Sequence, residues 1–152
     1  MDQAQWMKEA LALAEEAGAD GEIPVGAVIV DRDGQIIGRG RNRRQSGDPL
    51  GHAELIAIRQ AAEAIGDWRL EGTTMVVTLE PCAMCAGALV NARVEKLIFG
   101  ADDPKAGFCG TLGNLVQDAR LNHRLEVVRG LEAESSKRLL QGFFQGLREA
   151  AE

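Results

Sequence analysis

The 152-residue sequence has no apolar stretch long enough to cross a bilayer. Its longest apolar run is IPVGAVIV at 23–30, whereas a transmembrane helix needs about 20 apolar residues. The first twenty residues carry acidic side chains among the apolar ones and lack a basic segment followed by an apolar core, so a secretory signal is not predicted. We expect a cytoplasmic protein with no membrane partner.

Cysteine, histidine and basic residues are also scarce. Three cysteines are an odd number and do not favour a disulfide framework. The excess of 23 acidic over 17 basic residues gives a net charge of −6, which speaks against nonspecific nucleic-acid binding over the whole surface. It leaves room for a local basic patch. RGRNRR at 39–44 gathers four arginines, which form either such a patch or an ordinary solvated loop.

Apolar periodicity predicts alternating helices and strands in one domain, 1–152, without repeats or linkers. Residues 52–65 form a helix with Leu55, Ile58, Ala62 and Ile65 on one face. The order indicates a three-layer α/β/α sandwich with a mixed five-stranded sheet, whose last two strands can be parallel because a long crossover joins them. The predicted helices are 2–17, 52–65, 82–92 and 132–150, and the strands are 25–30, 35–41, 73–79, 95–100 and 125–130.

Two of the cysteines lie in TLEPCAMCAGAL at 78–89, at the start of a predicted helix. A C-x-x-C pair there fits a redox site or a metal site equally well. His52 opens another helix that is expected to begin at the same edge of the sheet as the helix after Cys82 and Cys85. Two thiolates and a neutral imidazole balance the charge of Zn²⁺ and leave one coordination position open, which is the catalytic pattern. Glu54, two residues after His52, is then a candidate proton carrier.

Two alternatives remain at this point. In the first, zinc has a purely structural role, with Cys109 or His123 as a fourth protein ligand. In the second, Cys82 and Cys85 are packed core thiols and His52 caps a helix. Neither alternative gives Glu54 a function. Glu80, the other acid close to the cysteines, precedes Pro81 at a strand end and is expected to be structural.

HAE at 52–54 and PCAMC at 81–85 resemble the H-x-E…P-C-x-x-C signature of zinc-dependent nucleoside and nucleobase deaminases. FGADDPKAG at 99–107, LNHR at 121–124 and the last helix with its FF pair resemble the tRNA-specific adenosine deaminases more narrowly. The resemblance implies a cytidine-deaminase-like fold and hydrolytic deamination of adenosine to inosine at the wobble position of a tRNA anticodon. Zinc-activated water would be the nucleophile, Glu54 would transfer protons, and no nucleotide cofactor would be needed.

The resemblance also implies a substrate site for a flipped nucleoside in an anticodon stem-loop. Asn42 would contact this nucleoside and Val25 would pack beside its base, in a pocket lined by the backbone of Ala53 and Pro81. Members of the family are homodimers in which RNA touches both subunits, and a homodimer is therefore expected. The residues that would meet neighbouring nucleotides are Asp103, at a 2′-hydroxyl, together with Lys105, Asn122, Phe144 and Arg148.

Some alternatives stay open beside the resemblance. Asp103 could instead be a turn residue before Pro104, and Phe144 could belong to the core. A rival enzyme is a free-base deaminase acting on guanine or cytosine with the same metal and the same glutamate. A rival from another class is a catalytically silent, zinc-stabilised RNA-binding subunit, but such subunits typically lose the glutamate that Glu54 provides.

Overall fold

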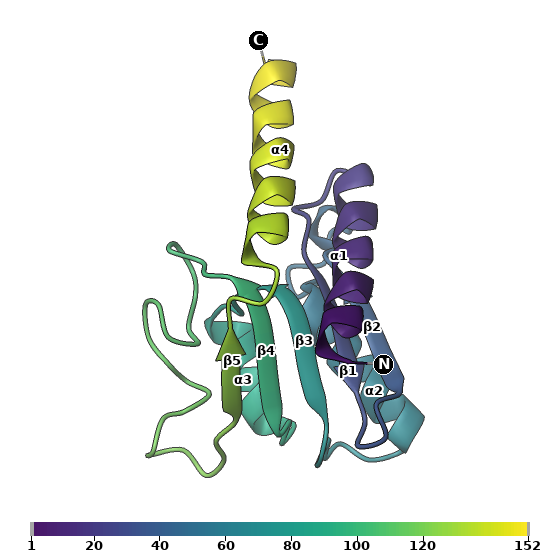
Figure 1. Ribbon diagram of the computed structural model, residues 1–152, viewed down its shortest axis with the longest axis vertical. Helices are drawn as coiled ribbons and strands as arrows, with labels where there is room; N and C mark the ends of the chain where they lie inside the picture. Colours follow the sequence, from purple (N-terminus) through teal and green to yellow (C-terminus); the bar gives the residue numbers. More distant parts are fainter. Residues whose placement is uncertain (1, 152) are drawn as a thin grey trace.

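The computed structural model describes residues 2–151, leaving Met1 and Glu152 outside, and its elements follow the predicted order (Figure 1). Predicted and observed element bounds differ by a few residues at most, and a short 3-10 helix, η1, adds to the prediction. None of the described helices is long and apolar enough to cross a membrane. The elements are α1 (Gln3–Ala19), β1 (Gly26–Val30), β2 (Ile36–Arg41), η1 (Arg44–Ser46), α2 (Ala53–Ile65), β3 (Thr74–Leu79), α3 (Ala83–Asn91), β4 (Lys96–Ala101), β5 (Glu126–Arg129) and α4 (Ala133–Ala151).

The five strands form one mixed sheet in the order β2-β1-β3-β4-β5. β1 is antiparallel to β2 and to β3, whereas β3, β4 and β5 run parallel, which confirms the predicted parallel pairing of the last two strands. Strands β2, β3, β4 and β5 therefore all end at one edge of the sheet. The segments that follow them meet at this carboxyl edge, where open α/β sheets usually bind ligands.

Helices cover both faces of the sheet, which confirms the three-layer sandwich (Figure 1). α1 lies against β1 and β3, and the first turns of α4 contact β4. The opposite face carries α2 and α3, and the larger hydrophobic cluster lies between them and the sheet, around Met75, Leu97 and Phe99. The smaller cluster under α1 consists of Met7, Ala10, Val28, Val30, Val76 and Ile98.

The buried face of α2 differs from the face that apolar periodicity singles out. Ala53, Ala57 and Ala61 are fully buried, while Ile65 is 46% exposed and Leu55, Ile58 and Ala62 are half-buried. The cause lies in β2, because a Cβ atom on Gly40 would come within 2.1 Å of the Ala53 carbonyl oxygen. Backbone thus packs on backbone at this contact. Ile58 and Ala62 still touch the edge of the core, whereas Leu55 and Ile65 lie on the outer side of α2.

Candidate active site

Three metal-ligating side chains converge at the carboxyl edge of the sheet. His52 is the N-cap residue of α2, Cys82 is the N-cap residue of α3, and Cys85 lies in the first turn of α3. The His52 Nδ1 atom is 3.6 Å from the Cys82 sulfur and 3.5 Å from the Cys85 sulfur. All three ligand atoms lie within 4.8 Å of one another, so the group could hold a metal ion.

The spacing of this group fits zinc. Zn–S bonds of about 2.3 Å and Zn–N bonds of about 2.0–2.1 Å in a tetrahedral arrangement place sulfur and nitrogen about 3.6 Å apart. The observed distances agree with that value. The hydrogen bond from Cys85 lowers the pKa of the Cys82 thiol to about 3, so one thiolate exists at neutral pH. Hydrogen bonding to that thiolate and burial raise the pKa of Cys85, and a divalent cation would favour the second thiolate as well.

Glu54 lies in the first turn of α2 beside these ligands and is only 4% exposed. Burial raises the pKa of its carboxyl to about 7, because a charged carboxylate loses its hydration there. A general acid–base group works best when its pKa lies near the operating pH. Glu54 is therefore suited to take up and give back a proton near neutral pH.

The two remaining candidates for a fourth ligand lie elsewhere. The thiol of Cys109 is 3.9 Å from the Pro81 carbonyl oxygen, outside the group of three. His123 Nε2 contacts the Val94 carbonyl oxygen at 2.7 Å. Val94 precedes β4, so His123 belongs to the amino edge of the sheet, opposite the proposed ligands. Within residues 2–151, the arrangement does not favour a closed four-ligand site.

A cavity of about 400 Å³ opens over the metal-ligand group. Asn42, directly after β2, accepts a hydrogen bond from the Ala53 backbone N–H through its Oδ1 atom at 3.0 Å. This bond leaves the Nδ2 group of Asn42 as a donor toward the cavity. Its lining includes Ile23, Val25, Asn42, Arg44, His52, Glu54, Leu79, Glu80, Cys82, Asp102, Asp103, Pro104, Lys105, Ala106, Leu140 and Phe144.

The segment after β4 forms one wall of this cavity. Asp103 accepts hydrogen bonds from the backbone N–H groups of Lys105 and Ala106 through one carboxylate oxygen, so it does act as a turn residue. Its second oxygen remains available for other contacts. Pro81 and Ala53 do not line the cavity, and the Pro81 carbonyl oxygen accepts the Phe108 N–H at 2.9 Å.

α4 contributes the outer part of the site. Phe144 is 41% exposed, which argues against a purely core role, and it borders both the cavity and a neighbouring groove of about 590 Å³. Arg148 and Lys105 also line this groove. Arg148 donates a hydrogen bond to Gln145 at 2.7 Å along the same helix. Figure 1 shows α4 extending well beyond the sheet, so its apolar face is open along much of its length.

Asn122 is not brought to this cavity within one chain. It is exposed and directly precedes His123, whose ring contacts Val94 at the amino edge of the sheet. Of the predicted substrate contacts in the described range, Asn122 is the one that the fold separates from the rest.

Arg44 is a lining residue that the sequence did not single out. Buried Glu22 accepts hydrogen bonds from the backbone N–H groups of Arg44 and Gln45 at 2.9 and 2.8 Å, which fixes η1 beside the cavity. The Arg44 side chain forms no ion pair with residues 2–151, whereas neighbouring Arg41 pairs with Asp20. The arginine cluster at 39–44 signalled a basic patch, but charge alone could not tell which side chain faces the cavity.

The sequence model of the MafB19-like deaminase family matches residues 1–148. The chain is also 51% identical over 144 residues to the tRNA-specific adenosine deaminase of Bacillus subtilis, covering 94% of this chain and 89% of the relative. The chain belongs to the tRNA-specific adenosine deaminase family. The resemblance drawn from the HAE and PCAMC segments is thereby confirmed.

Solved structures place this family member among related deaminases. A structure from a study of A-to-I editing by tRNA:A34 deaminases at the wobble position of transfer RNA has a TM-score of 0.85 and 42% identity, covering 90% of this chain and 99% of that one. A guanine deaminase from Nitrosomonas europaea has a TM-score of 0.80 and 25% identity, covering 92% and 83%. The fold is thus shared with a free-base deaminase, and the higher identity lies with the tRNA enzymes.

Proposed function

We propose that this protein hydrolyses adenosine to inosine at the wobble position of a tRNA anticodon. One observation carries the proposal: His52, Cys82, Cys85 and buried Glu54 lie together under a cavity of about 400 Å³ in a member of this family. The cavity has room for one base, and its outer walls, around Phe144 and Lys105, are open to more of an RNA chain.

We propose that the metal is zinc and that His52, Cys82 and Cys85 are its protein ligands. When bound in such a site, zinc supplies a water molecule with a pKa close to neutrality as the nucleophile. The chain holds its three ligands on two helix N-termini, whose dipoles favour thiolate. Because three side chains of residues 2–151 meet there, one coordination position is left for that water.

Glu54 would carry the protons of the reaction. With a carboxyl pKa raised to about 7 by burial, it can remove a proton from the attacking water and donate one to the adenine ring nitrogen. It can then take the second proton, from the hydroxyl group formed on C6, and pass it to the amine, which leaves as ammonia while the C6 carbonyl forms. Asn42 would hold the nucleoside through its free Nδ2 donor, and Val25 would pack beside the base.

The wider RNA contacts follow the open walls of the cavity. The target base must leave its stack to reach buried Glu54, which is easier in an anticodon loop than in a duplex. Lys105 and Arg148 would contact phosphates, Phe144 would stack on a neighbouring base, and the free oxygen of Asp103 would accept a 2′-hydroxyl. A tRNA substrate also supports a cytoplasmic location.

We further propose a homodimer. The outer side of α2 presents the half-buried Leu55 and Ile56 and the exposed Ile65, and Trp68 beyond the helix is 54% exposed. Such an apolar surface is typical of an association surface. A second subunit would also account for Asn122, which lies too far from the cavity of its own chain and could meet RNA bound to the partner.

The test is to incubate zinc-loaded protein with anticodon stem-loops carrying A34, with free adenosine and with guanine. Inosine should form in the stem-loop, with one ammonia released per inosine, and guanine should remain unchanged. Deamination of guanine without stem-loop activity would instead identify a free-base deaminase. Stem-loop binding without ammonia release would identify a silent RNA-binding subunit.

A further inference from the structure

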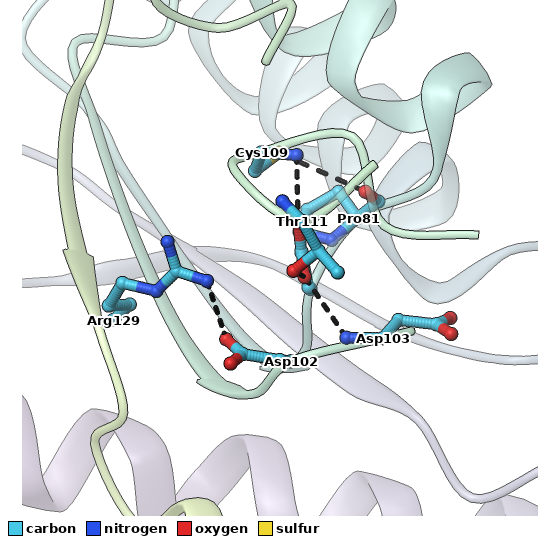
Figure 2. Close-up of polar contacts among 7 residues, drawn as sticks. Pro81, Asp102, Asp103, Cys109, Thr111 and Arg129 are labelled. Atoms are coloured by element: carbon cyan, nitrogen blue, oxygen red, sulfur yellow. Dashed lines mark hydrogen bonds and ion pairs between the residues drawn. The ribbon is translucent and has the colours of Figure 1, made fainter. Parts of the chain in front are cut away.

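The carboxylate of Glu80 lies at the junction between β3 and the metal-binding helix α3, and it is only 2% exposed. Within the described residues no Lys, Arg or His forms an ion pair with it. Four donors surround it instead. Three are backbone N–H groups, from Asp103, Cys109 and Thr111, each 3.0 Å from a carboxylate oxygen, and the fourth is the Thr111 hydroxyl. Figure 2 shows Asp103, Cys109 and Thr111 converging from the loop after β4.

Along the chain, these donors flank the segment that forms the cavity wall. Asp103 is at the start of the wall segment 103–106, and Cys109 and Thr111 follow its end. The loop closes tightly over the carboxylate, because a Cβ atom on Gly107 would come within 2.4 Å of the Glu80 side chain. The loop approaches Glu80 through its own backbone, so the carboxylate fixes both ends of the wall.

The same segment is also tied to the metal ligands. Glu80 is joined to Cys82 through Pro81, whose carbonyl oxygen accepts the Phe108 N–H, and Cys82 pairs with Gly107 in an antiparallel bridge. Beside the wall, Arg129 at the end of β5 donates to Asp102 at 2.7 Å (Figure 2). The Glu80 carboxylate, together with these two backbone contacts, therefore sets the distance between the metal ligands and the wall.

We propose that Glu80 is a positioning residue for substrate selection. It holds residues 103–106 at a fixed separation from the metal ligands, so that the nucleotides flanking the target base meet a preformed wall. This inference rests on the proposed function and adds a role for a residue that the reaction chemistry itself does not use.

Glu80→Gln is the most informative variant, because it keeps the shape of the side chain. If its NH2 group took the Oε2 position, the backbone N–H groups of both Cys109 and Thr111 would lose their acceptor. If the NH2 group took the Oε1 position, only the Asp103 N–H would lose its acceptor, because the Thr111 hydroxyl can rotate and accept a hydrogen bond from the amide. We expect the second orientation, which frees the Asp103 end of the wall and keeps the other end.

The zinc-loaded variant should keep one zinc per chain and a kcat near that of the wild type. Its KM for an anticodon stem-loop should rise by up to about 10- to 100-fold, the energy of one hydrogen bond to a charged acceptor, because binding must then order a wall that this bond no longer holds. Selectivity is the decisive readout. The ratio of kcat/KM between the stem-loop and one with an abasic nucleotide beside A34 should fall about 10-fold. A loss of folded protein would lower both values of kcat/KM together and leave their ratio unchanged.

Thr111 offers a milder pair of variants at a partly exposed position. Thr111→Val removes one of the four donors and should move the selectivity ratio in the same direction by about 2- to 5-fold. Thr111→Ser keeps the hydroxyl and should match the wild type. Amide hydrogen exchange provides a readout without substrate: Glu80→Gln should accelerate exchange at Asp103 more than at Cys109.

Unchanged selectivity in both Glu80→Gln and Thr111→Val, in a wild type that makes inosine, would overturn the positioning role. Loss of zinc in proportion to loss of activity would also overturn the positioning role, because Glu80 would then serve to stabilise the metal site. A wild type that makes no inosine would overturn the proposed function instead. In that case the hydrogen-exchange experiment still tests the contact between Glu80 and the Asp103 N–H. Equal amide exchange rates at Asp103 in the wild type and in Glu80→Gln would show that this contact does not hold the wall.

Discussion

The side chains left over from the proposed ligand set provide a direct test of it. Cys109 and His123 are the remaining cysteine and histidine of the chain; both contact backbone carbonyl groups and lie outside the group of three. Cys109→Ser and His123→Ala should each retain one zinc per chain by elemental analysis, whereas His52→Ala should lose it. Zinc loss in either of the first two variants would favour a closed structural site.

Glu54 should be dispensable for binding and essential for chemistry. Glu54→Gln keeps the shape of the side chain but cannot exchange protons near neutral pH. Zinc content and stem-loop affinity should stay at wild-type values, while inosine formation falls by about 10⁴-fold or more, since general acid–base catalysis alone is worth about 10²–10⁴. A variant that also lost zinc would make Glu54 a ligand or a structural support, and an active variant would contradict the mechanism.

Arg44 should contribute a phosphate contact, because it lines the cavity from a loop fixed by Glu22 and forms no ion pair within residues 2–151. Arg44→Ala should raise KM for the stem-loop about 10-fold. It should also reduce the salt dependence of binding by about 0.7 in log–log slope, the value for one phosphate of a single strand. Arg32→Ala, in the exposed β1–β2 turn, is the matched control and should leave both quantities unchanged. An unchanged slope for Arg44→Ala would exclude the contact.

Among the elements, the contact of α2 with β2 can be tested separately from the chemistry. In Gly40→Ala, the new Cβ atom would lie 2.1 Å from the Ala53 carbonyl oxygen, so α2 must shift. Thermal or denaturant unfolding should show a loss of about 1–3 kcal/mol, the usual cost of overpacking. Zinc affinity should fall as well, because His52 caps the displaced helix.

Gly142→Ala is the control for that prediction. Nothing lies within 4 Å of a Cβ atom at this position of α4, and alanine favours a helix over glycine by about 1 kcal/mol. The control should therefore leave stability unchanged or raise it slightly. A Gly40→Ala protein as stable as the wild type would show that the sheet and helix can separate at little cost.

The order and type of the elements could be read from the sequence because apolar periodicity and turn residues are local signals. The strand 73–79 and the last helix were predicted within a few residues of their observed bounds. The buried face of α2 could not be predicted from the sequence, because apolar periodicity favours the positions with the larger apolar side chains. Its burial is decided by Gly38 and Gly40 on another element, which let alanines approach more closely than leucine or isoleucine can.

Some residues of the candidate site could likewise be predicted from the sequence, and others could not. His52, Cys82 and Cys85 could be grouped from chemistry and helix starts alone, because zinc limits which residue types are useful. Arg44 and the surroundings of Glu80 depend on how two loops fold, and their hydrogen bonds go mostly to backbone groups that every residue carries. Such contacts leave almost no mark in the order of side chains.

At the scale of the whole molecule, the proposed dimer predicts a specific dependence on the outer side of α2. Ile65→Glu introduces a charge into that surface and should convert the protein to monomers in sedimentation velocity, with its helical content unchanged. Leu112→Glu, at a residue 54% exposed in the loop after β4, should remain dimeric. A wild-type protein that sediments as a monomer at micromolar concentration would contradict the dimer.

The close contact between α2 and β2 has a consequence for how this protein can change over time. A contact between glycine and a helix backbone has no rotamers, so nearby side chains can vary in size without moving His52. The loops at 42–51 and 102–112, in contrast, contribute residues to the cavity, would face the RNA in the proposed function, and carry none of the five strands. Substitutions there can retune which nucleotides are accepted while the deamination chemistry stays in place. Catalysis and substrate selection can therefore change independently of each other in this fold.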